Sequence, residues 1–258
     1  MSAPDGKKLI ASCSFGKDSL AAIITAEEHG IHIDEAVYCR IMFDEEISAE
    51  LPEHEEFIHT KAIPLLRERY GIKTTIVQAT ETYCSRFFTV YKDRSKKKGQ
   101  IYGFPMRQGA WCNSHLKVRP INKWQKAAGE YTAVVGIAAD EPKRINRKTE
   151  RDNLLPLVKY GITEAEAFKI CERGGCLSPA YNNGRTRLGC WFCHNQRINE
   201  LRRLRKEHPE LWKRLLALDE VSPCRFTTRS TVNQFDERFR QEDAQLSIFD
   251  FIRKEGDA

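Results

Sequence analysis

Ser14-Phe15-Gly16-Lys17-Asp18-Ser19 joins an apolar run to an apolar helical pattern, and this stretch decides the fold. Residues 7–14 have the composition of a short buried strand. Residues 19–29 form a helical stretch that Gly30 ends as a natural C-cap. A strand, a tight loop and a helix in this order predict the first unit of an α/β fold.

Strands and helices continue to alternate over the first 140 residues. Such alternation predicts an α/β fold with a parallel, Rossmann-like sheet covered by helices on both faces. The further strands are expected at residues 36–43, 74–78 and 132–138, and a helix at 52–70.

The later sequence changes character. Residues 80–120 show no clean period, which is typical of a functional insertion. After Pro156 the pattern is helical and rich in cysteine and glycine, and a long amphipathic helix is expected over 196–218. We therefore predict a nucleotide-binding domain at 1–160, a helical cysteine-rich module at 161–230 and a flexible polar tail at 231–258.

Composition indicates a globular protein. The 258 residues are 41% hydrophobic, yet no run approaches the roughly 18 apolar residues of a membrane helix, and the N-terminus lacks an apolar signal core. Five of the nine cysteines fall between Cys171 and Cys224, a spacing that suits a metal site better than a disulfide framework. We expect a reducing, cytoplasmic location without membrane attachment.

The net charge is +6. Basic residues cluster at 94–98, 143–151 and 197–206, which favours phosphate-rich partners. The alternative for the last cluster is a solvated helix face with ion pairs between residues four apart.

The loop at residues 14–19 has the chemistry of a phosphate site. Small residues at Ser14, Gly16 and Ser19 let backbone N–H groups approach oxygens at a helix N-terminus. Lys17 adds a cation, and Asp18 suits helix capping or Mg²⁺. A Walker A loop is excluded because it needs Gly at the place of Ala11 and Ser or Thr at the place of Asp18. An ordinary strand-to-helix turn is the remaining alternative.

These residues resemble the PP-loop, Ser-x-Gly-x-Asp-Ser, of the adenine nucleotide alpha hydrolase superfamily, whose members cleave ATP between its α and β phosphates. The segment from Trp111 to Pro120 is similar to the cysteine, lysine and proline segment of the phosphoadenosine phosphosulfate (PAPS) reductase family. The segment from Gly136 to Arg144 is similar to the arginine-bearing loop of that family.

The resemblance implies an adenine nucleotide, ATP or one like PAPS, together with Mg²⁺. Residues 14–19 and Gly136 would then cradle the nucleotide. Asp44, after the second strand, could bind Mg²⁺ or the ribose, or else cap a helix or stay solvated. The catalytic residues expected are Lys17, Asp18, Lys117 and Arg144, with Arg147 as a further candidate for phosphate charge.

The cysteines suggest a second site. Cys190 and Cys193 form a C-x2-C pair after Gly189. In iron-sulfur members of the family a tandem cysteine pair precedes such a motif; here Cys112 matches its second member and Trp111 replaces the first. We therefore predict a [4Fe-4S] cluster, with Zn²⁺ as the alternative. The expected ligands are Cys112, Cys176, Cys190 and Cys193, and the possible substitutes are Cys171, Cys224 and His194.

The reductase reaction itself is not supported. Sulfonucleotide reductases use a C-terminal cysteine in a Glu-Cys-Gly-aliphatic-His segment, which this sequence lacks. The resemblance then implies an ATP pyrophosphatase that adenylates an acceptor for sulfur incorporation, similar to the PP-loop component of DNA phosphorothioation systems. The expected partners are a nucleic acid, preferably DNA, and a cysteine desulfurase-type sulfur donor. The alternatives are a reductase using Cys224 and a noncatalytic nucleotide- and DNA-binding subunit.

Gln245-Leu246-Ser247-Ile248-Phe249 resembles the peptide by which bacterial proteins dock on the replication sliding clamp. The alternative is a terminal element that packs these apolar side chains onto the body of the protein.

Overall fold

The computed structural model describes residues 7–92, 95–106, 109–149 and 153–256, and for 147–149, 183 and 246–256 it describes the backbone alone. Within these ranges, no helix is both long enough and apolar enough to cross a membrane. The chain forms two compact units. Unit 1 comprises Met1–Thr82 and His115–Cys190, and unit 2 comprises Tyr83–Ser114 and Trp191–Ala258.

Unit 1 contains a parallel sheet with the strand order β3-β2-β1-β4-β5. Ser12 of β1 pairs with Val37 of β2 and with Val135 of β4, so the carboxyl ends of the central strands meet at one edge. The order reverses between β1 and β4, the place where open α/β sheets bind ligands. The strands are β1 (Lys8–Ser12), β2 (Glu35–Arg40), β3 (Lys73–Gln78), β4 (Tyr131–Val135) and β5 (Asn153–Leu154).

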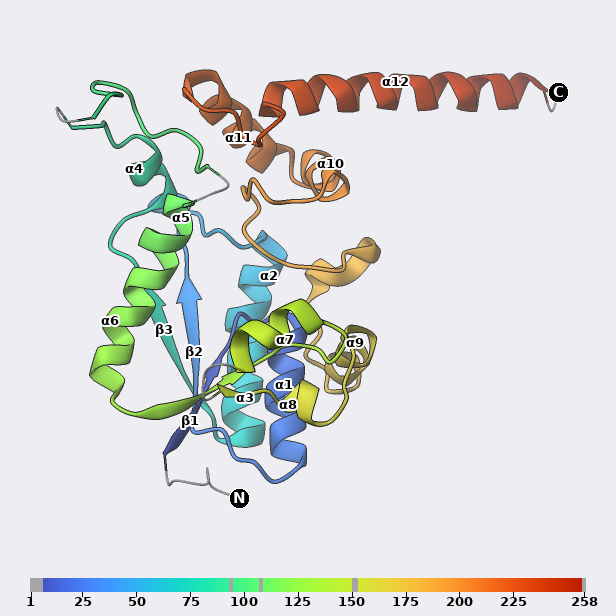
Figure 1. Cartoon of the computed structure of the whole chain (residues 1–258). Helices are drawn as coiled ribbons and strands as arrows, with labels where there is room; N and C mark the ends of the chain where they lie inside the picture. The colour runs from blue at the N-terminus through green and yellow to red at the C-terminus, as the bar shows by residue number, and fades with distance from the viewer. Residues whose placement is uncertain (1–6, 93–94, 107–108, 150–152, 257–258) are drawn as a thin grey trace. The chain divides into compact units, whose positions relative to one another are not determined.

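Helices cover both faces of this sheet, as predicted (Figure 1). Leu9 and Ala11 of β1 point into the larger core with α1 (Lys17–Glu28), whereas Ile10 points to the opposite face. There the core is completed by Ile121 and Trp124 of α6 (Arg119–Ala128). The α/β prediction is therefore confirmed, and β5 is an additional edge strand that the sequence pattern did not reveal.

The remaining helices of unit 1 follow the sequence closely. The helix expected at 52–70 is interrupted by a π turn just before Pro64, because proline has no N–H to continue the α-helical hydrogen bonds. The helices are α2 (Pro52–Phe57), η1 (Ile58–Ala62), α3 (Ile63–Tyr70), η2 (Ser114–Val118, which begins at the last residue of a unit 2 segment), α7 (Pro142–Thr149), α8 (Pro156–Lys159), α9 (Glu164–Arg173) and the 3-10 turn η3 (Pro179–Gly184).

The two units do not follow the expected boundary at residue 160. Residues 161–190 belong to unit 1 because α9 packs its buried Ala167 and Ile170 against the core around α1. The insertion Tyr83–Ser114 belongs instead to unit 2. Unit 2 thus combines two segments distant in sequence.

Most of the predicted tail forms one long helix, α12 (Val232–Gly256), which the sequence pattern did not predict. Thr231 and Gln234 bond to each other's backbone N–H groups at the start of α12. Asp236 accepts hydrogen bonds from Arg205 and Trp212, which anchors the helix within unit 2. The side chains of the clamp-like peptide from residue 246 onward lie outside the described residues. The other helices of unit 2 are α4 (Tyr83–Phe87), α5 (Trp111–Asn113), α10 (Ile198–Glu207) and α11 (Pro209–Val221).

Candidate nucleotide-binding site

The loop between β1 and α1 is held in an unusual backbone conformation. Phe15 has a φ of 56°, the left-handed region that a bulky residue adopts at a cost of about 1–3 kcal/mol. Its ring is fully buried and packs edge-on against Tyr38 at 5.3 Å. The buried ring therefore holds the turn that leads into α1.

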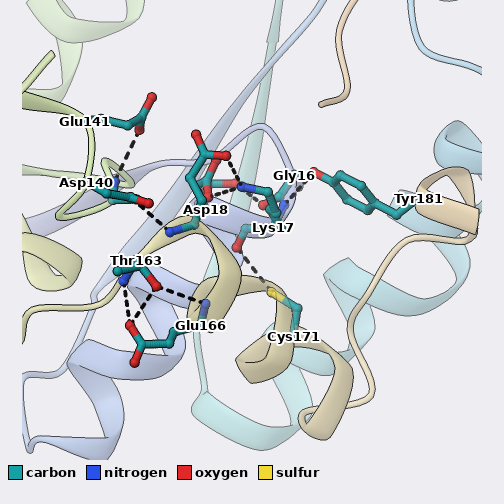
Figure 2. Close-up of polar contacts among 12 residues, drawn as sticks. Gly16, Lys17, Asp18, Asp140, Glu141, Thr163, Glu166, Cys171 and Tyr181 are labelled. Carbon is teal, nitrogen blue, oxygen red and sulfur yellow. Dashed lines mark hydrogen bonds and ion pairs between the residues drawn. The ribbon is translucent and has the colours of Figure 1, made fainter. Parts of the chain in front are cut away.

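This turn leaves backbone donors at the start of α1. Among the described residues, the N–H groups of Gly16 and Asp18 have no hydrogen-bond partner. The N–H of Lys17 instead donates to the Tyr181 hydroxyl at 2.9 Å (Figure 2). Ser19 braces the loop, since its Oγ accepts from the Ser14 N–H and donates to the Gly16 carbonyl. Two amides and a helix N-terminus thus suit a phosphate group.

Gly136, just after β4, is the second backbone element of the site. A Cβ at this position would lie 2.4 Å from the Asp18 carbonyl oxygen and 2.7 Å from the Ser19 amide nitrogen. Only glycine permits this approach, because the neighbouring atoms are backbone and cannot rotate away. The sequence prediction places Gly136 beside the loop, and the structure brings it there.

The Lys17 side chain is buried and paired with carboxylates, unlike that of a lysine exposed to bind phosphate. Its side chain is only 6% exposed, and Nζ lies 2.7 Å from the Asp18 carboxylate and 3.5 Å from that of Glu164 (Figure 2). Asp140 in turn accepts from the Glu164 N–H at 3.1 Å. Lys17 therefore ties the loop to α9.

The other expected site residues, Arg144, Lys117 and Asp44, lie on three different segments. Arg144 is exposed on α7 and donates to both oxygens of Glu141 at 2.7 Å. Lys117 is exposed on η2. Asp44 accepts from the backbone N–H groups of Glu46 and Ile47, so its carboxylate closes a turn. The side chain of Arg147 lies outside the described residues.

A titratable cluster beside the loop is absent from the sequence prediction. His54 on α2 is 1% exposed, with Nδ1 2.9 Å from the Ser178 hydroxyl and Nε2 3.9 Å from the Glu50 carboxylate. Burial lowers the pKa of His54 to about 4, while its contact with the Ser14 backbone acts in the opposite direction. His54 is therefore neutral at physiological pH and lies next to the phosphate loop.

Glu50 and Glu55, two carboxyl groups of this cluster, differ in their charged partners. Glu55 forms an ion pair with Arg40 and accepts a hydrogen bond from the Ser48 hydroxyl at 3.0 Å. Burial and the nearby Glu55 carboxylate raise the pKa of Glu50 to about 7, with Lys117 acting against them. A carboxyl group with a pKa near 7 can accept or release a proton at physiological pH.

Tyr38 completes the cluster. Its hydroxyl is buried without a hydrogen-bond partner among the described residues, and burial followed by Glu50 raises its pKa. Glu50 and His54 belong to no sequence motif, so only their proximity in the structure identifies them as candidate site residues.

Of the four predicted cluster ligands, Cys176 and Cys190 belong to unit 1, and Cys112 and Cys193 belong to unit 2. In the described part of the chain, no three His, Cys, Asp or Glu side chains are grouped so as to hold a metal ion. Cys176 is fully buried in the core of unit 1, where it interacts with Cys171. The Cys171 thiol also lies 3.1 Å from the Lys17 carbonyl oxygen (Figure 2). The four-cysteine cluster therefore stays a prediction.

The remaining predicted ligands are distributed over both units. Cys112 and Cys193 interact within unit 2, where burial, together with Cys193, raises the pKa of Cys112 to about 11. Cys190 is the last residue of unit 1 and is partly buried. We assign no chemical step to a cluster.

Comparisons with known proteins give distant relatives. No protein-family model matches the chain. An uncharacterized protein of Methanocaldococcus jannaschii is 26% identical over 220 residues, which cover 81% of this chain and 40% of that protein. An uncharacterized nin region protein of Escherichia phage lambda is 44% identical over 50 residues, 18% of this chain and 17% of that protein. This chain thus spans less than half the length of either relative.

One solved structure is similar in outline. The phosphate complex of PAPS reductase from Candida auris aligns with a TM-score of 0.44 and 10% identity, over 71% of this chain and 81% of that chain. The strand order and the parallel register, rather than this similarity, define the fold.

Proposed function

We propose that this protein is a PP-loop ATP pyrophosphatase that adenylates an acceptor for sulfur incorporation, the acceptor being a nucleic acid and preferably DNA. The observation that carries the proposal is the loop at the carboxyl edge of the sheet. There the Gly16 and Asp18 amides have no hydrogen-bond partner among the described residues, and Gly136 allows the close approach of β4. This combination suits the phosphates of an adenine nucleotide.

Each residue of the site has a role in this proposal. The loop amides hold the phosphates, and Lys117 and Arg144 neutralise their charge. Lys17, through Asp18 and Glu164, fixes the start of α1. Asp18 is the loop carboxylate that would hold Mg²⁺ together with the phosphates, and the ion would offset charge on the departing pyrophosphate.

Glu50 provides the proton acceptor. As the carbonyl oxygen of a nucleobase attacks the α-phosphorus and the bond to pyrophosphate breaks, the proton of the neighbouring ring N–H passes to the Glu50 carboxylate. A group with a pKa near the working pH is suited to this exchange. His54, held neutral and 3.9 Å from Glu50, positions it.

Sulfur incorporation extends the proposal to partners. The adenylated acceptor would release AMP when a sulfur nucleophile, supplied by a cysteine desulfurase-type donor, attacks it. A basic chain with a net charge of +6 supports a polyanionic acceptor. The clamp-like peptide at residues 245–249 would bring the enzyme to DNA.

Incubation of the anaerobic full-length protein with ATP labelled at the α-phosphate tests the reaction. We expect labelled AMP together with unlabelled pyrophosphate, and less of both in Lys117→Ala. Formation of ADP and inorganic phosphate would refute the proposal, and tight ATP binding without turnover would favour a noncatalytic subunit.

A sulfonucleotide reductase is the second candidate. Cys224 lines a pocket of unit 2 next to Arg225, a place accessible to a substrate. This candidate predicts thioredoxin-dependent release of sulfite from PAPS that disappears in Cys224→Ser. Sulfite release that persists in this variant would exclude Cys224 as the nucleophile.

A further inference from the structure

The segment Tyr83–Ser114 carries an unusual share of the charge. It contains seven Lys or Arg residues and a single acidic residue, Asp93, so its excess equals the +6 of the whole chain. The remaining 226 residues are therefore neutral on balance. A charge concentrated in one segment indicates a polyanionic partner for that segment.

Within this segment the chain turns back on itself and exposes four lysines to solvent. The Tyr91 N–H donates to the Gln100 carbonyl and the Tyr102 N–H to the Thr89 carbonyl, each at 2.9 Å. The lysines at 92, 96, 97 and 98 are all exposed around the end of this hairpin. The hairpin is thus a basic projection.

The base of the hairpin is fixed to a second segment of unit 2. Phe104 is buried and packs edge-on against Phe226 at 5.1 Å, and its N–H donates to the Ser222 hydroxyl. Gly103 adopts a φ of 66°, and a Cβ there would lie 2.6 Å from Ser222 and 2.7 Å from Pro223. The base of the hairpin therefore packs directly against segment 222–226.

Apolar side chains lie among the cations. Phe88 is 49% exposed, Val90 52% and Met106 65%. These three are half of the large hydrophobic side chains that are exposed among the described residues. The rings of Tyr91 and Tyr102 contact each other at a tilt of 38°, with their centroids 4.4 Å apart. The Lys97 ammonium lies 5.8 Å from the Tyr91 ring, and the Arg86 guanidinium lies 5.2 Å from the Tyr102 ring. In single-stranded nucleic acid, exposed bases alternate with phosphates along the strand. Cations with apolar and aromatic groups between them can contact the phosphates and the bases of such a strand together.

A pocket adjoins this surface within unit 2. Its volume is about 580 Å³, within the usual range for sites that enclose a small molecule. Lys97 and Arg225 supply positive charge, while the exposed Asn195 and Thr228 supply an amide and a hydroxyl for base edges. Cys224 also lines the pocket.

We propose that the basic hairpin and this pocket form a binding site for single-stranded nucleic acid. The exposed lysines contact the phosphates, Phe88 and Met106 contact bases, and the pocket takes one nucleotide of the strand. That the bound strand is the acceptor of the adenylation rests on the proposed function. Duplex binds less well, because its bases are stacked away from the apolar side chains.

Fluorescence anisotropy of the full-length protein with labelled 20-nucleotide DNA, without ATP, tests the site. Lys96→Gln/Lys97→Gln/Lys98→Gln should weaken binding at least tenfold and reduce the slope of log K against log salt by about 2, since each single-strand contact contributes roughly 0.7. Lys73→Gln/Lys123→Gln/Lys126→Gln removes three exposed charges from unit 1 and serves as the matched control. Phe88→Ala should weaken binding about tenfold with an unchanged salt slope.

Several results would overturn the site: equal effects of the two triple variants, tighter binding of duplex than of single strand, or binding to anionic phosphatidylserine vesicles without binding to the oligonucleotide. Thermal unfolding of each variant shows that it is folded. Because ATP is absent, oligonucleotide binding with no AMP formation in the labelling assay would refute the proposed reaction and leave the site standing.

Discussion

Gly136 lies directly against the backbone of Asp18, so that a Cβ at residue 136 would come within 2.4 Å of the Asp18 carbonyl oxygen. The end of β4 and the first turn of α1 are therefore packed as closely as two backbones allow. This contact sets the position of the loop amides relative to the sheet.

Gly136→Ala should displace the start of α1. Overpacking of this kind costs about 1–3 kcal/mol in the free energy of unfolding, and we expect ATP binding to weaken at least tenfold. Calorimetric titration and thermal unfolding measure the two effects. Gly189→Ala, where a Cβ meets nothing within 4 Å, is the control. An alanine variant at 136 that binds ATP as the wild type does would remove Gly136 from the site.

Lys117→Ala should weaken ATP binding and leave stability unchanged. The side chain is exposed, so its removal uncovers no core, while loss of one charge-assisted contact to phosphate corresponds to roughly tenfold to hundredfold in Kd. Titrations at low and high salt measure the effect. Lys126→Ala, an exposed lysine of α6, should bind ATP normally. Equal affinities of the two variants would argue against a phosphate contact of Lys117.

Tyr181→Phe should destabilise the protein without nucleotide. The variant leaves the buried Lys17 N–H without its acceptor, which costs about 1–3 kcal/mol. Tyr131→Phe removes an exposed hydroxyl that bonds to Gln125, where water can replace it, and should change stability little. Chemical denaturation distinguishes the two variants, and identical midpoints would show that the Tyr181 hydrogen bond is not a structural one.

The sequence predicts the centre of the fold well, because there local pattern and tertiary packing agree. The apolar run before Ser14 and the helical pattern after Ser19 specify β1 and α1 without reference to the rest of the chain. The two-residue strand β5 carries no such pattern, since its pairing with β4 comes from tertiary contacts alone. The tail helix was missed because its start depends on the pair Thr231 and Gln234 rather than on apolar residues.

The candidate site is less visible in the sequence. Spacing alone suggested Cys176 as a metal ligand, but Gly175 has a φ of 68° and turns the chain so that the Cys176 N–H bonds to the Cys171 carbonyl inside the core. Glu50 and His54 flank Pro52, where no pattern marks them. Their relation to Lys117 arises only when the chain returns after 63 residues to the same region of unit 1.

Glu50→Gln should change the pH dependence of both the free energy of unfolding and the rate of AMP formation, because the pKa of the Glu50 carboxyl is raised. In the folded state Glu50 has a pKa of about 7, against 4.5 for an ordinary glutamate, so the native protein binds this proton more tightly than the unfolded chain. The contribution of Glu50 to stability is therefore present below pH 4.5 and is lost as the pH rises to 7, by roughly 3 kcal/mol. His54 acts in the opposite sense, since its folded pKa of about 4 makes stability fall as the pH drops from 6.5 to 4.

Glutamine does not ionise, so the Glu50→Gln variant should be more stable than the wild type at pH 8 and nearly equal to it at pH 4.5. The same variant should form AMP more slowly and lose the dependence of the rate on a group titrating near pH 7. Glu55→Gln uncouples Arg40 and removes one of the charges that raise the Glu50 pKa, so it should destabilise the protein and shift the pH dependence of AMP formation to lower pH without abolishing it. If the Glu50 variant retains the wild-type pH profile of AMP formation, the proton acceptor is another group.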